Sequence, residues 1–182
     1  MSLPSIETTN LFSVEGKSAI VVGATGAFGQ VACAALANAG AKLTIAAGSA
    51  DKLEDLSAAL SKRGHVVNSV AKRPNSEADC QAILDAGLSE YGRIDILVNA
   101  AGVNDVSPAE DMSLERFQNV MLANVEGAWL MAKTVGAQMI KQGDGGKVVF
   151  TSSARGKLGH PAGYSAYCTS KSAIDGMTKA LG

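Results

Sequence analysis

Short apolar segments alternate with longer segments of helical periodicity along the chain. Five runs are apolar at consecutive positions and partly β-branched, which is the pattern of strands that are buried on both faces. These predicted strands cover residues 19–22, 43–46, 66–70, 94–98 and 148–151. The segments between them repeat apolar side chains at helical spacing, which predicts helices over residues 30–39, 52–62, 77–90 and 114–141.

Individual residues define the faces and ends of these helices. One face of the second predicted helix carries Leu53, Leu56 and Leu60. One face of the fourth predicted helix carries Phe117, Val120, Met121, Asn124 and Trp129. We expect N-caps at Ser49, Ser76 and Ser113, and helix stops at Gly40, Gly64 and Gly92.

The regular alternation of strand and helix predicts βαβ units with right-handed crossovers. The expected fold class is therefore α/β, with a parallel sheet covered by helices on both faces. A chain of 182 residues can bury a sizeable core, and its length suggests one domain.

Composition narrows the range of ligands. Hydrophobic residues make up 47% of the chain, charged residues make up 18%, and the formal net charge is −1. Because acidic and basic residues are interspersed, we expect no broad positive surface for nucleic acid or for an anionic membrane. Small polar or neutral molecules are the favoured partners.

The cysteines, the apolar runs and the first residues indicate the cellular compartment of the protein. Cys33, Cys80 and Cys168 are far apart and lack the spacing of a zinc site, so we expect neither a disulfide framework nor a metal. No apolar run approaches the roughly 18 residues of a membrane span. Residues 1–10 have neither the basic nor the apolar region of a signal peptide. We therefore expect a cytoplasmic protein.

The first predicted strand runs into three glycines, Gly23, Gly26 and Gly29, which are spaced three apart. They lie between that strand and the first helix, where glycines allow a close approach of ligand and a positive φ. The free N–H groups and the positive dipole end of the helix favour a pyrophosphate. A purely structural turn is the alternative, but this position favours dinucleotide binding.

Three further segments lie at or beyond the ends of predicted strands, where ligands bind in such sheets. They are residues 97–102 (LVNAAG), 150–156 (FTSSARG) and 167–171 (YCTSK). If Tyr167 and Lys171 begin a helix, their spacing places them on one face, where the ammonium favours tyrosinate. A phenol with an ordinary pKa of about 10 could then exchange protons nearer neutrality. A hydroxyl at Ser153 can bind the same substrate oxygen.

With these motifs, the chain from Phe12 to its last residue resembles the short-chain dehydrogenase/reductase family. The resemblance rests on the glycine turn, the NAAG segment, Asn124 in the segment NVEG, and Tyr167 and Lys171 with the upstream Ser153. It implies a Rossmann-type doubly wound sheet of strand order 3-2-1-4-5 and NAD(P)-dependent interconversion of a secondary alcohol and a ketone. Gluconate 5-dehydrogenases are the most similar members, so sugar acids or polyols are the expected substrates. An acyl-carrier-protein ketoreductase and a catalytically silent dinucleotide-binding sensor or scaffold are the alternatives.

The resemblance also implies catalytic roles. Tyr167 would transfer the proton, Lys171 would assist it and bind the nicotinamide ribose, Ser153 would hold the substrate oxygen, and Asn124 would support a water relay. Ser152 is the alternative serine, but the family pattern of serine, small residue, any residue and glycine selects Ser153. Tyr164 competes with Tyr167 but has Cys168, not lysine, four positions later.

The implied coenzyme site combines the glycine turn, the ends of the second and fourth strands, and the catalytic pair. Its expected residues are Gly23, Thr25, Gly26, Ala27, Phe28, Gly29, Ser49, Asn99, Ala100, Gly102, Tyr167 and Lys171. Ala27 stands where the family has its middle glycine, so the amide of Phe28 is expected to face the pyrophosphate.

The adenosine end departs from the family in a way that bears on coenzyme choice. Ala47 stands where an acid would bind the ribose hydroxyls of NAD, and Gly48 where an arginine would meet the extra phosphate of NADP. Lys72 replaces the acid expected near the adenine and is followed by Arg73. We expect NAD(P), with a slight preference for NADP.

The family normally continues with two more strands and a substrate-covering segment, whereas this chain ends at Gly182. We therefore expect a single domain over residues 1–182 that is truncated at its carboxyl end, with an open apolar fifth strand, poor solubility and essentially no activity in that form. The long fourth helix carries Leu130, Met131 and Met139 besides its sheet-facing residues. Since family members commonly pair this helix and the next one, a homodimer or homotetramer is expected.

Overall fold

Five strands form one sheet in the computed structural model of the chain, which describes residues 13–182. They are β1 (Ser18–Val22), β2 (Lys42–Ala46), β3 (Val67–Val70), β4 (Ile96–Asn99) and β5 (Lys147–Phe150). Their order is β3-β2-β1-β4-β5 and every neighbouring pair is parallel, which confirms the predicted doubly wound sheet. Phe12 and residues 1–10, on which two of the expectations rest, lie outside the described residues.

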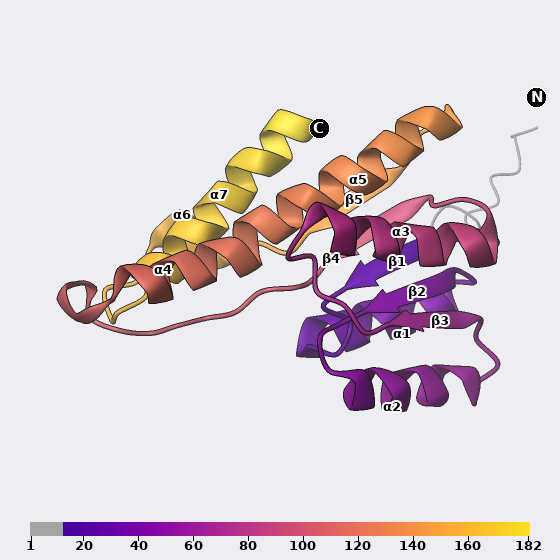
Figure 1. Ribbon diagram of the computed structural model, residues 1–182, viewed down its shortest axis with the longest axis horizontal. Helices are drawn as coiled ribbons and strands as arrows, with labels where there is room; N and C mark the ends of the chain where they lie inside the picture. The colour runs from indigo at the N-terminus through magenta and orange to yellow at the C-terminus, as the bar shows by residue number, and fades with distance from the viewer. Residues whose placement is uncertain (1–12) are drawn as a thin grey trace, which may run out of the picture.

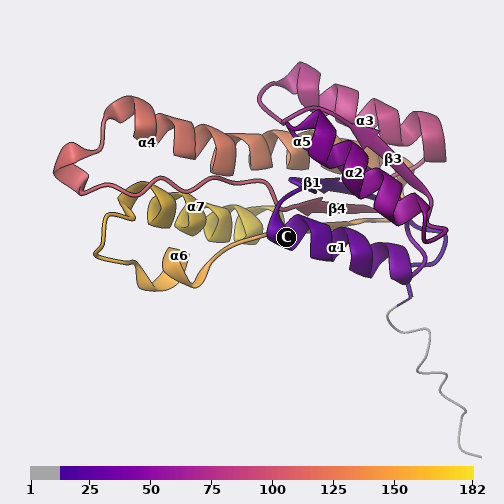
Figure 2. The same cartoon turned by 90° about the horizontal axis from the view of Figure 1, so that it is seen from below.

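Helices cover both faces of this sheet (Figures 1 and 2). The helices α1 (Ala27–Asn38) and α2 (Ala50–Ser61) pack on one face, and α3 (Glu77–Tyr91) and α5 (Gly127–Gln142) pack on the other. The other helical segments are η2 (Ala109–Asp111), α4 (Leu114–Met121), η3 (Leu122–Glu126), α6 (Ala154–Leu158) and α7 (Ser165–Leu181). Figure 1 shows α4, α6 and α7 gathered at one end of the molecule, away from β2, β3 and α2.

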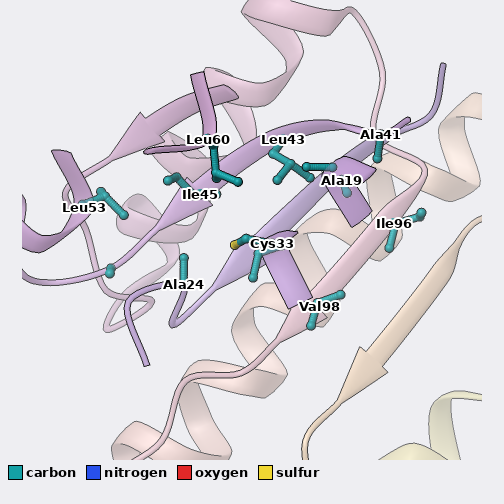
Figure 3. Packing of buried hydrophobic residues seen from close by; sticks show 13 residues of the cluster. Ala19, Ala24, Cys33, Ala41, Leu43, Ile45, Leu53, Leu60, Ile96 and Val98 are labelled. Carbon is teal, nitrogen blue, oxygen red and sulfur yellow. The ribbon is translucent and has the colours of Figure 1, made fainter. Parts of the chain in front are cut away.

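The side chains of β1 alternate between two apolar layers, as the two-residue period of a strand requires. Ala19 and Val21 pack with α1 and α2, whereas Ile20 and Val22 pack with α3 and α5. Figure 3 shows the first layer, in which Cys33 of α1 lies among the strand side chains. Because both faces of the central strand are buried, its consecutive apolar residues are explained.

The last residues of the strands are paired in one row. Val22 of β1 pairs with Ala46 of β2 and with Asn99 of β4. Ala46 pairs in turn with Val70, and Asn99 with Phe150. The segments that follow these residues therefore leave the sheet at one common edge, where ligands bind in open parallel sheets.

The long fourth helix of the prediction has three parts, because α4 runs through the π-helical turn η3 into α5. A π turn adds a residue to the turn and so rotates the following side chains relative to an uninterrupted α-helix. The prediction that Trp129 shares a face with Val120 and Asn124 is wrong for a different reason, because Trp129 follows Asn124 by five positions, which is about 140° around an α-helix. Trp129 is 46% exposed, whereas Val120 and Asn124 are buried.

The methionines of α5 also differ from expectation. Met131 and Met139 are buried in the layer between α5 and the sheet, so they belong to the sheet-facing set. Their assignment to a surface that is free for self-association is therefore wrong.

The helix ends agree with the sequence signals in part. The side chains of Ser76 and Ser113 cap their helices by accepting hydrogen bonds from the backbone N–H three residues on, as predicted. Ser49 precedes α2 but its side chain makes no capping hydrogen bond. The first helix begins at Ala27, three positions before the predicted start, and the short helix α6 had no sequence signal.

Candidate active site

Two adjoining cavities lie at the common edge of the sheet. The larger has a volume of about 560 Å³ and lies between the ends of β4 and β5 and helix α7. Its walls are formed by Phe28, Ala100, Ala101, Gly102, Val103, Asn104, Val149, Phe150, Thr151, Ser152, Tyr167 and Lys171. The smaller, of about 320 Å³, extends from the glycine turn to the ends of β2 and β3 and shares residues 100–103 with the first.

The glycine turn is packed too closely for side chains at two of its three glycines. Gly23 has a φ of +76°, and a Cβ on it would lie 2.6 Å from the Cα of Ala101. A Cβ on Gly29 would lie 2.8 Å from the Cα of Ala24, because α1 passes close to the turn. Gly29 therefore lets α1 start directly behind β1, and Gly23 lets the segment after β4 pass close to the turn, which is the arrangement that a pyrophosphate cradle needs.

The first turn of α1 offers the backbone donors for that cradle. Gly26 is the N-cap in an extended conformation and makes no side-chain capping bond, so the amides of Ala27 and Phe28 open the helix. The first N–H groups of a helix have no acceptor within it and bind anions well. Thr25 and Gly26 line the smaller cavity, and the ring of Phe28 lines the larger one. The residues present thus fit the pyrophosphate of a dinucleotide.

Tyr167 and Lys171 stand one helical turn apart on α7, and both line the larger cavity. The Nζ of Lys171 lies 5.7 Å from the centre of the Tyr167 ring and donates a hydrogen bond of 2.8 Å to the carbonyl oxygen of Thr151. Lys171 is 5% exposed, and this burial lowers the pKa of its ammonium. The structure therefore brings the predicted pair together beside a cavity, with a cation held in a partly desolvated position.

Asn124, in the π turn η3, is buried and ties three segments together. Its Oδ1 accepts a hydrogen bond of 2.6 Å from the backbone N–H of Val103. Its Nδ2 donates to the carbonyl oxygen of Val103 and to the hydroxyl of Ser170, each at 2.9 Å. The hydroxyl of Ser170 donates in turn to the carbonyl oxygen of Tyr167. Asn124 thus fixes α7 against the segment that follows β4.

Two serines follow β5, and the structure places them differently. Ser153 is the N-cap of α6, and its Oγ accepts a hydrogen bond of 3.2 Å from the backbone N–H of Arg155. Its hydroxyl proton is not used in that bond and can still be donated. Ser152 lines the larger cavity and donates a long hydrogen bond of 3.4 Å to the carbonyl oxygen of Lys171.

The second tyrosine of this region is engaged elsewhere. The guanidinium of Arg155 lies 3.6 Å above the centre of the Tyr164 ring, which is the geometry of a cation–π contact. The ring of His160 packs edge-on against the same tyrosine. Tyr164 lines neither cavity, whereas Tyr167 lines the larger one beside Lys171.

The predicted site residues do not all reach a cavity. Gly23, Thr25, Gly26, Phe28, Ser49, Ala100, Gly102, Tyr167 and Lys171 line one or both cavities. Neither cavity is lined by Asn124, Ser153, Ala27, Gly29 or Asn99. The side chain of Asn99 is buried at the end of β4, and its Nδ2 has no hydrogen-bond partner among the described residues.

Some contacts of the site carry no signal in the sequence. Ser170, Val103 and Thr151 hold Asn124 and Lys171 through backbone atoms or a single hydroxyl. Backbone partners leave no residue-type preference to detect, so these contacts depend on the tertiary structure.

Among residues 13–182, no group of three or more His, Cys, Asp or Glu side chains is arranged to hold a metal ion. None of the helices in that range combines the length and the apolar character of a membrane span.

Comparison with known proteins connects this geometry to a family. The short chain dehydrogenase family model matches residues 17–182. An uncharacterised oxidoreductase of Mycobacterium tuberculosis is 47% identical over 170 residues, which cover 93% of this chain and 62% of that protein. The D-threitol dehydrogenase of Mycolicibacterium smegmatis is 35% identical over 170 residues, which cover 93% of this chain and 65% of that enzyme.

A solved structure shows the same arrangement of elements. The crystal structure of an NAD⁺-bound xylitol dehydrogenase superimposes with a TM-score of 0.87 and 32% sequence identity. The match covers 91% of this chain and 64% of the xylitol dehydrogenase. The chain therefore spans a little under two thirds of the length of each of these three proteins.

Proposed function

The chain belongs to the short-chain dehydrogenase/reductase family, and from this premise we propose that the protein interconverts a secondary alcohol and a ketone with NAD(P). The observation that carries the proposal is the position of Tyr167 and Lys171. Both line a cavity of about 560 Å³ that adjoins the glycine turn through a shared wall. A proton-transfer group, a cation and a dinucleotide cradle thus meet at one edge of the sheet.

In this proposal, the chain supplies binding, orientation and proton transfer. A bound nicotinamide would accept hydride from the alcohol carbon, or return it to the ketone. The phenol oxygen of Tyr167 would take the hydroxyl proton of the alcohol, or give a proton back to the ketone oxygen. The ammonium of Lys171 would stabilise negative charge on that phenol oxygen and bind the nicotinamide ribose. Its hydrogen bond to Thr151 keeps it in the cavity wall.

Asn124 and Ser153, which line neither cavity in the structure, would support this exchange. Asn124 uses both of its amide hydrogens within the chain, and its Oδ1 keeps one lone pair free for a water next to Lys171. We therefore propose a positioning role for Asn124, with a water relay as its second role. Ser153 would turn its free hydroxyl proton towards the substrate oxygen.

A matched pair of serine variants tests that last assignment. Ser153→Ala is expected to lower kcat by about 10- to 100-fold, since it removes a hydrogen bond to a substrate oxygen that carries developing charge. Ser152→Ala should cost much less, because its hydroxyl is held only by the long bond to Lys171. Steady-state kinetics that show the larger loss in Ser152→Ala would transfer the role to Ser152.

We propose a polyol or a sugar acid as the substrate. The support is the similarity to a D-threitol dehydrogenase and to a xylitol dehydrogenase, together with the open shape of the larger cavity at the ends of β4 and β5. A spectrophotometric screen of polyols, sugar acids and β-keto thioesters, with both coenzymes and the complete protein, tests this. Activity with polyols or sugar acids is the expected result. Activity restricted to β-keto thioesters would indicate a ketoreductase, and no activity with any of them would contradict the proposal.

For the coenzyme we propose a preference for NADP, although the xylitol dehydrogenase structure holds NAD⁺. NAD-selective sites place a carboxylate at the end of the second strand, which binds the ribose hydroxyls and repels a 2′-phosphate. Ala47 occupies that position here, and it lines the smaller cavity. We also propose that the protein works in the cytoplasm, where free thiols such as those of Cys33 and Cys80 stay reduced.

We further propose a homodimer or homotetramer, through a different surface of α5 from the one expected. Trp129, Lys133, Gly136 and Ile140 follow one another at helical spacing on the side of α5 that faces away from the sheet. Trp129 is 46% and Ile140 is 83% exposed, and a Cβ on Gly136 would meet no atom within 4 Å. This flat stripe suits close packing of a second copy.

Gly136→Arg is expected to convert the oligomer into monomers without unfolding the chain. The Cβ of the new side chain would meet no atom within 4 Å in its own subunit, and its guanidinium would meet the partner helix. Light scattering at micromolar concentration measures the mass, and circular dichroism checks the fold. A monomeric mass for the unmodified protein, or an unchanged oligomer for Gly136→Arg, would contradict this surface.

A further inference from the structure

The smaller cavity ends at a contact between two residues that come from different strands. Gly48 follows β2, and Arg73 follows β3. A Cβ on Gly48 would overlap the Nε of Arg73 and lie 2.9 Å from its Cζ. The arginine side chain therefore lies flat across the backbone of Gly48, at the end of the cavity opposite the glycine turn.

Backbone conformation does not explain the glycine at this position. Gly48 is not among the glycines with a positive φ, so another residue could adopt its backbone angles. The guanidinium end of Arg73 is what a side chain at position 48 would meet, and the arginine would have to move to admit one. Gly48 therefore leaves room for Arg73 in its present position.

The charge around this contact is positive. Lys52, Lys72 and Arg73 line the cavity, and its walls contain no carboxylate. Lys72 is neutralised by a hydrogen-bonded ion pair of 2.8 Å with Asp79. Among residues 13–182, neither Lys52 nor Arg73 takes part in an ion pair. Two cations therefore face this cavity without a counter-ion from the described chain.

We propose that Arg73, lying across Gly48, is the residue that recognises the 2′-phosphate of NADP, with Lys52 as a second cation beside it. This inference rests on the proposed function, which places the adenosine ribose in the smaller cavity. A guanidinium presents a planar fork of donors that matches a phosphate in two parallel hydrogen bonds. Ala47 and Gly48, which follow the second strand, carry no side chain that can bind a phosphate. Arg73, which follows the third strand, places its guanidinium beside Gly48 instead.

The test uses two fragments of the coenzyme that differ only in this phosphate, adenosine 2′,5′-bisphosphate and adenosine 5′-monophosphate. Calorimetry on the complete protein should show that the bisphosphate binds at least about tenfold tighter. Arg73→Gln should weaken the bisphosphate by about 10- to 100-fold, because a charge-assisted hydrogen bond is lost, and leave the monophosphate unchanged. Arg73→Lys should fall between, since it keeps the charge and loses the fork.

Arg63→Gln is the matched control, because it removes the same charge from an exposed position beyond the end of α2. It should change neither affinity. If both fragments bind the unmodified protein equally well, or if Arg73→Gln keeps the preference, the inference fails while the proposed function stands. If neither fragment binds, the dinucleotide site itself is refuted.

Discussion

Replacing Tyr167 by phenylalanine is expected to reduce kcat by about 100- to 10,000-fold, the usual contribution of a general acid or base. The substitution removes only the phenol oxygen, and the ring keeps its place beside Lys171 in the wall of the larger cavity. Coenzyme affinity should therefore be unchanged. Steady-state kinetics together with calorimetric titration of the coenzyme separate the two effects.

Tyr164→Phe provides the control on the same segment. The ring of Tyr164 stacks under the guanidinium of Arg155, and phenylalanine preserves that contact. This variant should keep nearly full turnover. Substantial activity in Tyr167→Phe, or an equal loss in both variants, would remove Tyr167 from the role of proton donor.

Replacing Lys171 by methionine is expected to damage both turnover and coenzyme binding. Turnover should fall by roughly 100-fold or more because the phenol oxygen loses its neighbouring cation. Coenzyme affinity should fall by about tenfold because the lysine is the proposed ligand of the nicotinamide ribose. Lys179→Met, on the exposed last turns of the same helix, is the control and should change neither.

The stability of the Lys171→Met variant adds a readout that activity does not give. Burial lowers the pKa of Lys171 in the folded protein, so the unfolded chain binds the proton more tightly. The buried charge therefore costs stability at neutral pH, and this cost disappears as the pH rises through the lowered pKa towards the ordinary value. Chemical denaturation should show that the unmodified protein gains stability relative to the variant over that alkaline range. A difference that is independent of pH would show that Lys171 is not held as a desolvated cation.

The parts of the site that depend on local spacing could be predicted from the sequence. Gly29 lies in the first turn of α1 and packs on Gly23 and Ala24, so its packing follows from a short stretch of chain. Tyr167 and Lys171 are one helical turn apart, and any helix at that position brings them together. The strand order follows from the alternation of strands and helices together with the family resemblance.

The parts that failed or were missed have two causes. Trp129 lies five positions after Asn124, which is about 140° around an α-helix, so the two do not share a face even by the ordinary helical period, and Trp129 is exposed. The other cause is contact between distant segments. The position of Arg73 over Gly48 arises only when β2 and β3 pair side by side. No periodicity or motif within either segment predicts that contact.

The central claim, that the protein moves hydride between an alcohol carbon and a nicotinamide, is tested most directly by an isotope transfer. A polyol or sugar acid that is oxidised by the complete protein is prepared with deuterium on the carbon that bears the reacting hydroxyl. Mass spectrometry of the recovered coenzyme then shows where the label has gone. The account predicts reduced coenzyme that carries one deuterium, and no labelled coenzyme from the Tyr167→Phe variant in the same time. Reduced coenzyme without deuterium, or a ketone product formed while the coenzyme stays oxidised, would contradict it.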